Sequence, residues 1–462
     1  MNRRQAIPAG YRVKSGLLVP ATMKAPARAS FDSSQEGTQL TKRFAYADNL
    51  GPNADNSTGV RKKVRARARY EAQNSTYARG ITLTVANDTI GTGPRLQMLT
   101  RNNSLNRDIE ITFWRWAREV RLAAKLRTMR LARLIDGEII AELVTNPKLT
   151  ATDVQLDLAL YEAEQLTNPY GLENSNRRYD GIEYDENGNP TGYYLLDEYP
   201  GDLTYTFLDP VPELHRADNI IHYFRVDRAG QKRGVSEIQS ALELFNMLRT
   251  YSKAVCDAAE TAANHAGLLY TQAPPDESPD DVAAFYETEI ARNMMQALPY
   301  GWDFRQLKAE QPTGTYAEFK REVINEIARC LNVPFNVAAL NSSEYNYASG
   351  RLDHQTYFRT IRIDQSDIEA EILDRILTTW LLEWGATRGL TNIARTGHRW
   401  FWDGREHVDP LKEAKAQTER LKNNTTTLAN EYSKDGVDWE EALAQRKREI
   451  EIVNSFSTPE SE

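Results

Sequence analysis

Apolar side chains recur at three- and four-residue spacing along much of the chain, which predicts a protein rich in amphipathic helices. In the first third we expect helices over about 61–87 and 108–134. Phe113, Trp116 and Val120 would lie on the buried face of the second one.

Two capping boxes predict where the next helices begin. Ser236 with Gln239 starts one, and Thr315 with Glu318 starts another that stops before Pro334. The first of these helices has an apolar stripe made of Ile238, Leu242, Phe245, Leu248, Val255, Ala259 and Ala262.

The longest predicted helix covers about 348–384, roughly 50 Å at 1.5 Å per residue. Its apolar stripe consists of Phe358, Ile361, Ile368, Ile372, Ile376, Trp380 and Trp384. Residues 385–409 are predicted to form strand and loop, and the tail is predicted to form two more helices, over about 410–432 and 438–453.

Alternation of apolar and polar residues predicts strands between the helices, so the fold class is α+β. The predicted strands lie at 138–144, 156–162 and 220–224, with a hairpin over 181–196. Asn187-Gly188, a strong turn signal, would form the tip of the hairpin. A small α/β segment follows over 266–311, with a strand at 267–272, a helix over 279–292 and strand segments through 296–307.

The length of 462 residues exceeds one typical core, so two or more domains are expected. Residues 1–60 are rich in Gly, Pro, Ser and Asn, which predicts an extended or partly ordered arm. No apolar run approaches the ~20 residues that span a bilayer, and the basic N-terminus lacks the apolar stretch of a secretion signal. Cys256 and Cys330 are expected to be small buried hydrophobic side chains.

Acidic residues outnumber basic ones, 65 to 57, for a net charge of −8. A protein that grips duplex DNA tightly usually carries a basic excess, so if this chain meets DNA we expect it to let the DNA slide past and not to hold it. Basic residues crowd the first third, whereas acidic residues dominate 173–209 and 276–289. In a ring built from this chain, the basic and the acidic segments would form belts at different heights. Most single charges are nevertheless expected to lie on solvated helix faces.

Motifs of common enzyme chemistry are absent from the sequence. It contains no P-loop, no His-Glu-x-x-His, no paired Cys-x-x-Cys and no Gly-x-Ser-x-Gly. Gly91-Thr92-Gly93 lacks a third glycine and precedes a proline, which favours a tight turn over a phosphate cradle. His215 and His222 lack a third ligand at metal spacing, so no zinc site is predicted.

Several short motifs follow one another in order over about 400 residues. They are the Arg- and Asn-rich segment 65–96, Asp136-Gly137-Glu138, 158–166, the hairpin 181–194, Pro200-Gly201-Asp202, 226–236, 346–351, 408–414, 436–438 and 445–449. Together they resemble the lambda-type phage portal proteins, and 226–236 (VDRAGQKRGVS) is the most specific piece. Ala348 replaces a more usual serine, and the N-terminal arm matches poorly.

The resemblance implies a portal fold with long stem and wing helices, a β-rich wing, a small α/β clip and a helical crown. About twelve subunits would surround a channel at one capsid vertex. The implied regions are an N-terminal arm (1–60), the wing (61–235), stem helix 1 (236–265), the clip (266–311), stem helix 2 (312–333), the tunnel loop (334–347), a long helix with the wing return (348–409) and the crown (410–462).

The resemblance also implies candidate site residues and partners. The tunnel loop would present to DNA the residues Asn341, Ser342, Ser343, Glu344, Tyr345, Asn346 and Tyr347, whose groups position a backbone without reading bases. Lys320, Arg321 and Arg329 are candidates for intermittent phosphate contacts, or equally for ion pairs between subunits. Asp280, Asp281 and Glu287 are candidates for docking the motor or the connector.

The implied partners are further copies of the chain, the terminase large subunit, the head–tail connector, the major capsid and scaffold proteins, and double-stranded DNA without sequence specificity. The implied location is the virion and, during assembly, the host cytoplasm. No metal, cofactor, membrane or enzymatic activity is expected.

Two alternatives stay open. One is a magnesium-dependent DNA-processing enzyme that uses the carboxylates of helix 348–384, which are Asp364, Asp367, Glu369, Glu371 and Asp374. The other is a smaller head–tail adaptor. The absent motifs together favour a structural protein over an enzyme.

Overall fold

The structure is a computed structural model that describes residues 11–14, 17–20, 49–169, 173–175, 177–201, 211–264, 268–271, 302–305, 315–343, 346–390, 392–404, 410–434 and 437–457. The chain divides into two units, Met1–Ala54 and Asp55–Glu462. In the first, β1 (Tyr11–Lys14) pairs antiparallel with β2 (Leu17–Pro20). The arm was predicted to extend to residue 60, whereas the second unit already begins at Asp55. Within it, the Asn56 side chain donates to the carbonyl of Arg233 at 2.8 Å.

Each of the two helices predicted in the first third is in fact a pair of helices. Instead of one helix over 61–87, the chain forms α3 (Thr58–Asn74) and α4 (Thr76–Ile90), separated by the extended residue Ser75. Ser75 caps α4 by accepting a hydrogen bond from the amide of Ala78. Instead of one helix over 108–134, α5 (Asn103–Glu119) and α6 (Leu122–Ile135) meet at Arg121, whose φ of 56° breaks the helix.

The helices of the central region follow the predicted apolar stripes. α7 (Leu242–Asn264) begins after a 3₁₀ turn (Gln239–Ala241), later than predicted. The Gln239 amide donates to the carbonyl of Ser236, and the Ser236 hydroxyl donates to the carbonyl of Leu134. α8 (Thr315–Cys330) confirms the helix that stops before Pro334. A further short helix, α9 (Phe335–Ala339), lies inside the segment predicted as a loop over 334–347.

The long helix over 348–384 is confirmed as a continuous helical segment of three parts. These are α10 (Tyr347–Ile368), the π-helix η5 (Glu369–Leu373) and α11 (Asp374–Ala386). The tail forms three helices where two were predicted: α12 (Pro410–Lys422), α13 (Leu428–Lys434) and α14 (Trp439–Ser457). The chain leaves the helix after Lys422, and Asn424 has a φ of 54°.

All predicted strands within the described residues are present, in small antiparallel sheets. One sheet has the order β10 (Ile220–Phe224), β4 (Glu138–Thr145), β5 (Leu156–Tyr161). A second has the order β6 (Arg178–Tyr179), β7 (Ile182–Tyr184), β8 (Pro190–Leu195), β9 (Glu213–Arg216), with Asn187-Gly188 between β7 and β8. β3 (Arg95–Met98) pairs with β13 (His398–Phe401), and β11 (Leu268–Thr271) pairs with β12 (Trp302–Arg305). The helix predicted over 279–292 lies outside the described residues.

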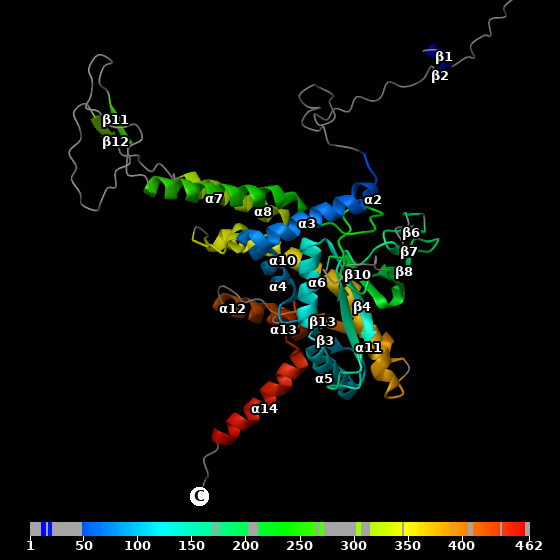
Figure 1. Cartoon of the computed structure of the whole chain (residues 1–462). Coiled ribbons are helices and arrows are strands. Elements are labelled where there is room, and N and C mark those ends of the chain that lie inside the picture. The colour runs from blue at the N-terminus through cyan, green and yellow to red at the C-terminus, as the bar shows by residue number, and fades with distance from the viewer. Residues whose placement is uncertain are drawn as a thin grey trace, which may run out of the picture. The chain divides into compact units, whose positions relative to one another are not determined.

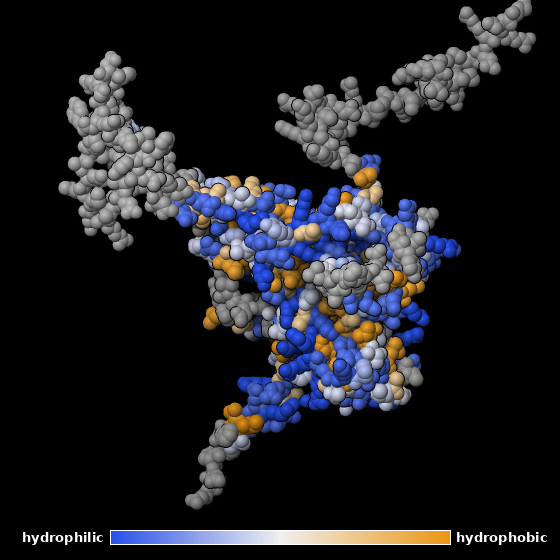
Figure 2. Space-filling model, in the orientation of Figure 1, coloured by the Kyte–Doolittle hydropathy of each residue, from blue (hydrophilic) through white to orange (hydrophobic). Residues whose placement is uncertain are grey.

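Two large cores hold the second unit together (Figure 1). In one, Trp116, Trp380 and Trp384 are fully buried between α5, α11 and the β10-β4-β5 sheet. In the other, α3, α4, α6, α7, α8, α9 and α10 share a core, and α7 packs against both α3 and α8. Figure 2 shows a largely hydrophilic face, with exposed apolar side chains near the end of α14, where Ile452 is 56% exposed. Among the described helices, none combines the length and apolarity needed to cross a membrane.

Candidate functional site

α7 and α8, the predicted stem helices, pack through their apolar stripes and a row of aromatic rings. Tyr251 of α7 lies edge-on to Phe319 of α8, with ring centroids 4.8 Å apart. The Tyr316 hydroxyl donates to Ser252 at 3.1 Å. The opposite face of α8 is exposed and mostly acidic, and comprises Glu318, Glu322, Asn325, Glu326 and Arg329. The pair therefore has one face for the core and one polar face for solvent or another molecule.

The predicted tunnel loop is an exposed turn between α9 and α10. Leu340 ends α9 with a φ of 49° and is 85% exposed. Asn341 accepts hydrogen bonds from both the amide and the hydroxyl of Ser343, and its own amide donates to the carbonyl of Asn336 at 3.1 Å. Asn341, Ser342, Ser343 and Asn346 are exposed, whereas Glu344, Tyr345 and the side chain of Tyr347 lie outside the described residues.

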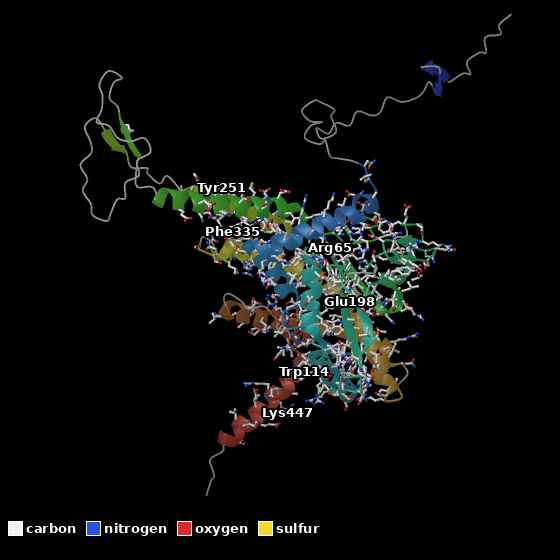
Figure 3. All side chains as sticks on the ribbon, in the orientation of Figure 1. Arg65, Trp114, Glu198, Tyr251, Phe335 and Lys447 are labelled. Atoms are coloured by element: carbon white, nitrogen blue, oxygen red, sulfur yellow. The ribbon has the colours of Figure 1, made fainter. Side chains whose placement is uncertain are left out.

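Side chains at its base tie the two ends of this loop together. Asn336 of α9 lies 2.9 Å from Nε2 of His354 on α10. The guanidinium of Arg321 lies 5.2 Å from the ring of Phe335, which starts α9 (Figure 3). The loop is thus held at its base while its polar groups face outward.

The three predicted phosphate contacts on α8 do not share one face. The Lys320 ammonium lies 5.4 Å from the ring of Tyr77 on α4, and Arg321 is directed toward α9. Arg329 is exposed and donates to Asn332 at 2.8 Å. Only Arg329 of this set is open to solvent, so the three do not form one basic site. Asp280, Asp281 and Glu287 lie outside the described residues.

The most specific sequence motif, 226–236, forms a buried ionic lock with the Asp136-Gly137-Glu138 turn. Glu138 is fully buried and accepts hydrogen bonds from Arg65 (3.1 Å), from Arg233 (2.8 and 2.9 Å) and from the amide of Gly234 (2.9 Å). Burial alone would raise the pKa of Glu138, but Arg233 and His222 outweigh it and hold the pKa well below its usual range. The motif is therefore structural.

Glycine is required in this lock. A Cβ on Gly234 would lie 2.1 Å from the carbonyl oxygen of Gly137, a backbone atom that cannot move aside. Gly137 itself has a φ of 91° and would meet the backbone of Val235 at 2.3 Å. The two glycines let the β4 turn and the 226–236 segment approach each other closely.

A second buried cluster joins α6 to the stem and to the long helix. Arg130 and Arg133 each bind Glu237, which precedes α7, and Asp364 on α10, with N–O distances between 2.6 and 3.3 Å. Burial would raise the pKa of Glu237, but the two arginines lower it below its usual range. A few basic residues of the first third are thus internal, namely Arg61, Arg65, Arg130 and Arg133. Most of the others are exposed or half-buried, as predicted.

The carboxylates proposed for a nuclease site are largely occupied by donors from the same chain. The indole of Trp402 donates to Glu369 at 2.6 Å, and the indole of Trp400 donates to Asp374 at 2.9 Å, with His398 equally close to Asp374. Since η5 is a π-helix, residues five apart lie one above the other, and this spacing places Glu369 and Asp374 on the face that meets these donors. Among the described residues, no three His, Cys, Asp or Glu side chains are placed to hold a metal ion.

The Gly91-Thr92-Gly93 segment is a tight turn, as predicted. Gly91 and Gly93 have φ values of 56° and 113°. The turn is held by Asp403, which accepts from both the amide and the hydroxyl of Thr92, and by Arg127, which donates to the carbonyl of Gly91 at 2.7 Å. An internal carboxylate therefore occupies the donors of this turn.

The two cysteines are less buried than predicted, and the two histidines contact carboxylates. Cys256 is exposed and Cys330 is half-buried with its sulfur 3.0 Å from the Ser240 hydroxyl, so the prediction of two buried cysteines was wrong. α7 turns the side chain of Cys256 away from its apolar stripe. His215 and His222 contact Glu142 and Glu138 at 2.7 and 3.1 Å.

The sequence profile of the family described as phage portal protein, lambda family, matches residues 40–365. This chain belongs to that family. A probable portal protein of Halomonas phage phiHAP-1 is 24% identical over 434 residues, which cover 86% of this chain and 81% of that protein. The portal protein of Escherichia phage N15 and portal protein B of Escherichia phage lambda are 23% and 22% identical, and the chain spans about 61% and 60% of their lengths.

Solved structures similar to this portal protein come from gene transfer agent particles. A chain in the neck of an empty particle has a TM-score of 0.46 at 13% identity, covering 76% of this chain and 85% of that one. A chain of the native virion has a TM-score of 0.45 at 13% identity, covering 78% and 88%. The family membership makes this a structural virion protein of a bacteriophage, and it favours the portal interpretation over the nuclease and the head–tail adaptor.

Proposed function

We propose that about twelve copies of this chain form a ring at one capsid vertex, through which the terminase motor packages double-stranded DNA and from which the DNA is later ejected. The head–tail connector attaches to the same ring. The support is the family membership together with the α7–α8 pair and the adjoining loop.

The exposed loop between α9 and α10 is the observation that carries the proposal. A segment that touches moving DNA must be held firmly at its base and present groups that bind weakly. The Asn336–His354 contact supplies the first property, and the side chains of Asn341, Ser342 and Ser343 supply the second. Amide and hydroxyl groups contact phosphate or sugar without a fixed positive charge, so each contact breaks easily.

The net charge supports sliding over tight binding. At −8 per chain, a ring of about twelve carries roughly −96, and a channel wall with part of that charge repels the phosphate backbone. Lys320 and Arg321 are half-buried beside aromatic rings, so they are less available for direct contact with phosphate than exposed basic side chains.

The remaining regions take the roles that the family resemblance assigns. Residues 61–235 form the wing, 236–265 and 312–333 the stem, and 348–409 the long helix and wing return. The clip over 266–311 docks the motor and later the connector, with Asp280, Asp281 and Glu287 as contacts, and the crown over 410–462 faces the capsid interior. Capsid and scaffold proteins surround the ring, which forms in the host cytoplasm and remains in the virion.

Exchange of the loop tests this proposal. Residues 341–346 are replaced by a Gly-Ala linker of equal length, so the ends of α9 and α10 stay in place. We expect rings of normal mass and a reduced yield of DNA-filled heads in a packaging assay. The control exchanges residues 186–189, at the tip of the β7–β8 hairpin, in the same way. Normal filling with the exchanged 341–346 loop would remove this loop from the DNA path.

A further inference from the structure

One side of α3 presents an exposed row of basic and aromatic residues. Lys63, Arg67 and Tyr70 are spaced at i, i+4 and i+7, so they follow one side of the helix. All three are exposed, Tyr70 at 52%. Within the described residues, neither Lys63 nor Arg67 forms an ion pair, in contrast to Arg65, which is buried against Glu138.

α8 presents an exposed row of the opposite charge and the same spacing. From its C-terminal side, Glu326, Glu322 and Phe319 follow at steps of four and three residues, the steps that separate Lys63, Arg67 and Tyr70. Both glutamates are exposed, and Phe319 is 40% exposed. No ion pair within the described part of the chain involves either glutamate.

The helix α7 packs between α3 and α8 and supports the aromatic residue of each row. Arg249 of α7 binds Glu71 at 3.0 Å and lies over the Tyr70 ring at 5.2 Å, whereas Tyr251 contacts Phe319. The aromatic rings of Tyr70 and Phe319 are therefore each held on one side by a residue of α7 and exposed to solvent on the other. Since α7 separates α3 from α8, the two rows do not pair with each other within one chain (Figure 1).

We propose that the row on α3 of one subunit docks antiparallel onto the row on α8 of the next copy. In this register Lys63 meets Glu326, Arg67 meets Glu322, and Tyr70 meets Phe319 at one end of the contact. This inference rests on the proposed ring and names a surface that joins its subunits. Because the two rows are different surfaces, the contact is head-to-tail, and a head-to-tail contact generates a closed ring when the rotation between subunits closes.

A second copy fits these rows better than DNA does. A phosphate backbone complements the basic row only, and it leaves the acidic row at matching spacing without a partner. Opposite rows also guide the approach of subunits and disfavour wrong registers, because a shift by one step along the helix places a charge opposite a ring. Ring assembly should accordingly be slower at high salt.

Two charge-reversed variants test the contact. Lys63→Glu with Arg67→Glu makes both rows acidic, and Glu322→Lys with Glu326→Lys makes both rows basic. Each variant alone is expected to lose the ring and remain a folded smaller species by native mass spectrometry, since all four side chains are exposed. Mixed in equal amounts, the two variants are expected to form rings in which they alternate, because every α3–α8 contact is then complementary again.

Matched controls change the same charges elsewhere. Lys447→Glu with Arg448→Glu lies on α14, away from α3 and α8 (Figure 3), and Glu186→Lys with Glu213→Lys lies at the tip of the β7–β8 hairpin and on β9. Both controls are expected to keep the ring. Far-ultraviolet circular dichroism checks that each variant is folded.

The outcomes separate this contact from the proposed function. If the wild-type protein forms rings and either reversed variant also forms unchanged rings, the α3–α8 contact is wrong and the proposed portal function still stands. If the Lys63→Glu, Arg67→Glu rings persist but no longer bind duplex DNA, the basic row is a phosphate surface and the proposal is wrong. Absence of rings from the wild-type protein itself contradicts the proposed function and this contact with it.

Discussion

Replacing Glu138 by glutamine should strongly destabilise the fold. In the native protein its two oxygens accept hydrogen bonds from two arginines, a histidine and a backbone amide, and the side chain is fully buried. Glutamine offers one acceptor oxygen and an NH₂ group with two donors, so part of this set would face an N–H group. Arg65 and Arg233 would also lose the charge that compensates their burial. Breaking a buried pair in this way costs about 3–5 kcal/mol.

The assay is urea unfolding followed by circular dichroism, with Glu186→Gln as the control. Glu186 pairs with Arg177 on the surface, where both side chains are more than 70% exposed, so its loss should change the unfolding free energy by less than about 1 kcal/mol. A Glu138→Gln variant that unfolds within about 1 kcal/mol of the wild type would refute the argument that the buried pair locks the wing.

The pH dependence gives a second measure of the same group. The pKa of Glu138 is depressed in the folded state, so its contribution to stability is present above the ordinary glutamate pKa and is lost as the pH falls below it. The wild-type protein should therefore lose stability between about pH 5 and pH 3 more steeply than Glu138→Gln. Parallel curves would show that Glu138 is not held as a carboxylate.

Three further predictions concern other parts of the structure. Gly234→Ala should destabilise the protein by about 3 kcal/mol or more, since its Cβ meets the Gly137 carbonyl; urea unfolding near the wild-type midpoint would contradict this. Burial, with Asp438 and its neighbours, raises the pKa of Glu110 to about 7, so the docking of α14 should loosen as pH rises from 5 to 8. The protection of α14 amides from hydrogen exchange should therefore fall over this pH range, and Glu110→Gln should remove the pH dependence of that protection. Trp402→Phe should cost about 1–2 kcal/mol through loss of its bond to Glu369, against no change for Trp114→Phe, which is 54% exposed.

Local patterns were sufficient to predict most of the strands and helices. The hairpin tip at Asn187-Gly188, the strand at 138–144 and the apolar stripes of α7 and α10 depend on residues close in sequence, and the structure confirms them. Helix ends were harder to predict. The break at Arg121 has no glycine or proline to announce it, and apolar periodicity continues on both sides of it.

Contacts between distant residues could not be predicted from local pattern. The capping box at Ser236 does not start α7, and the Ser236 hydroxyl instead donates to the carbonyl of Leu134, 102 residues away. Arg130 and Arg133 looked like surface charges, since only the folded chain brings Glu237 and Asp364 to them. The same holds for the nuclease alternative, because the carboxylates of the long helix find their indole donors some 30 residues further on.

The ring of subunits is the central claim, and the mass of the purified protein tests it most directly. Native mass spectrometry with negative-stain images should show about twelve copies of the 52.6-kDa chain, roughly 630 kDa, around a central hole. A monomer or dimer at high concentration, with no annular particles, would contradict the account.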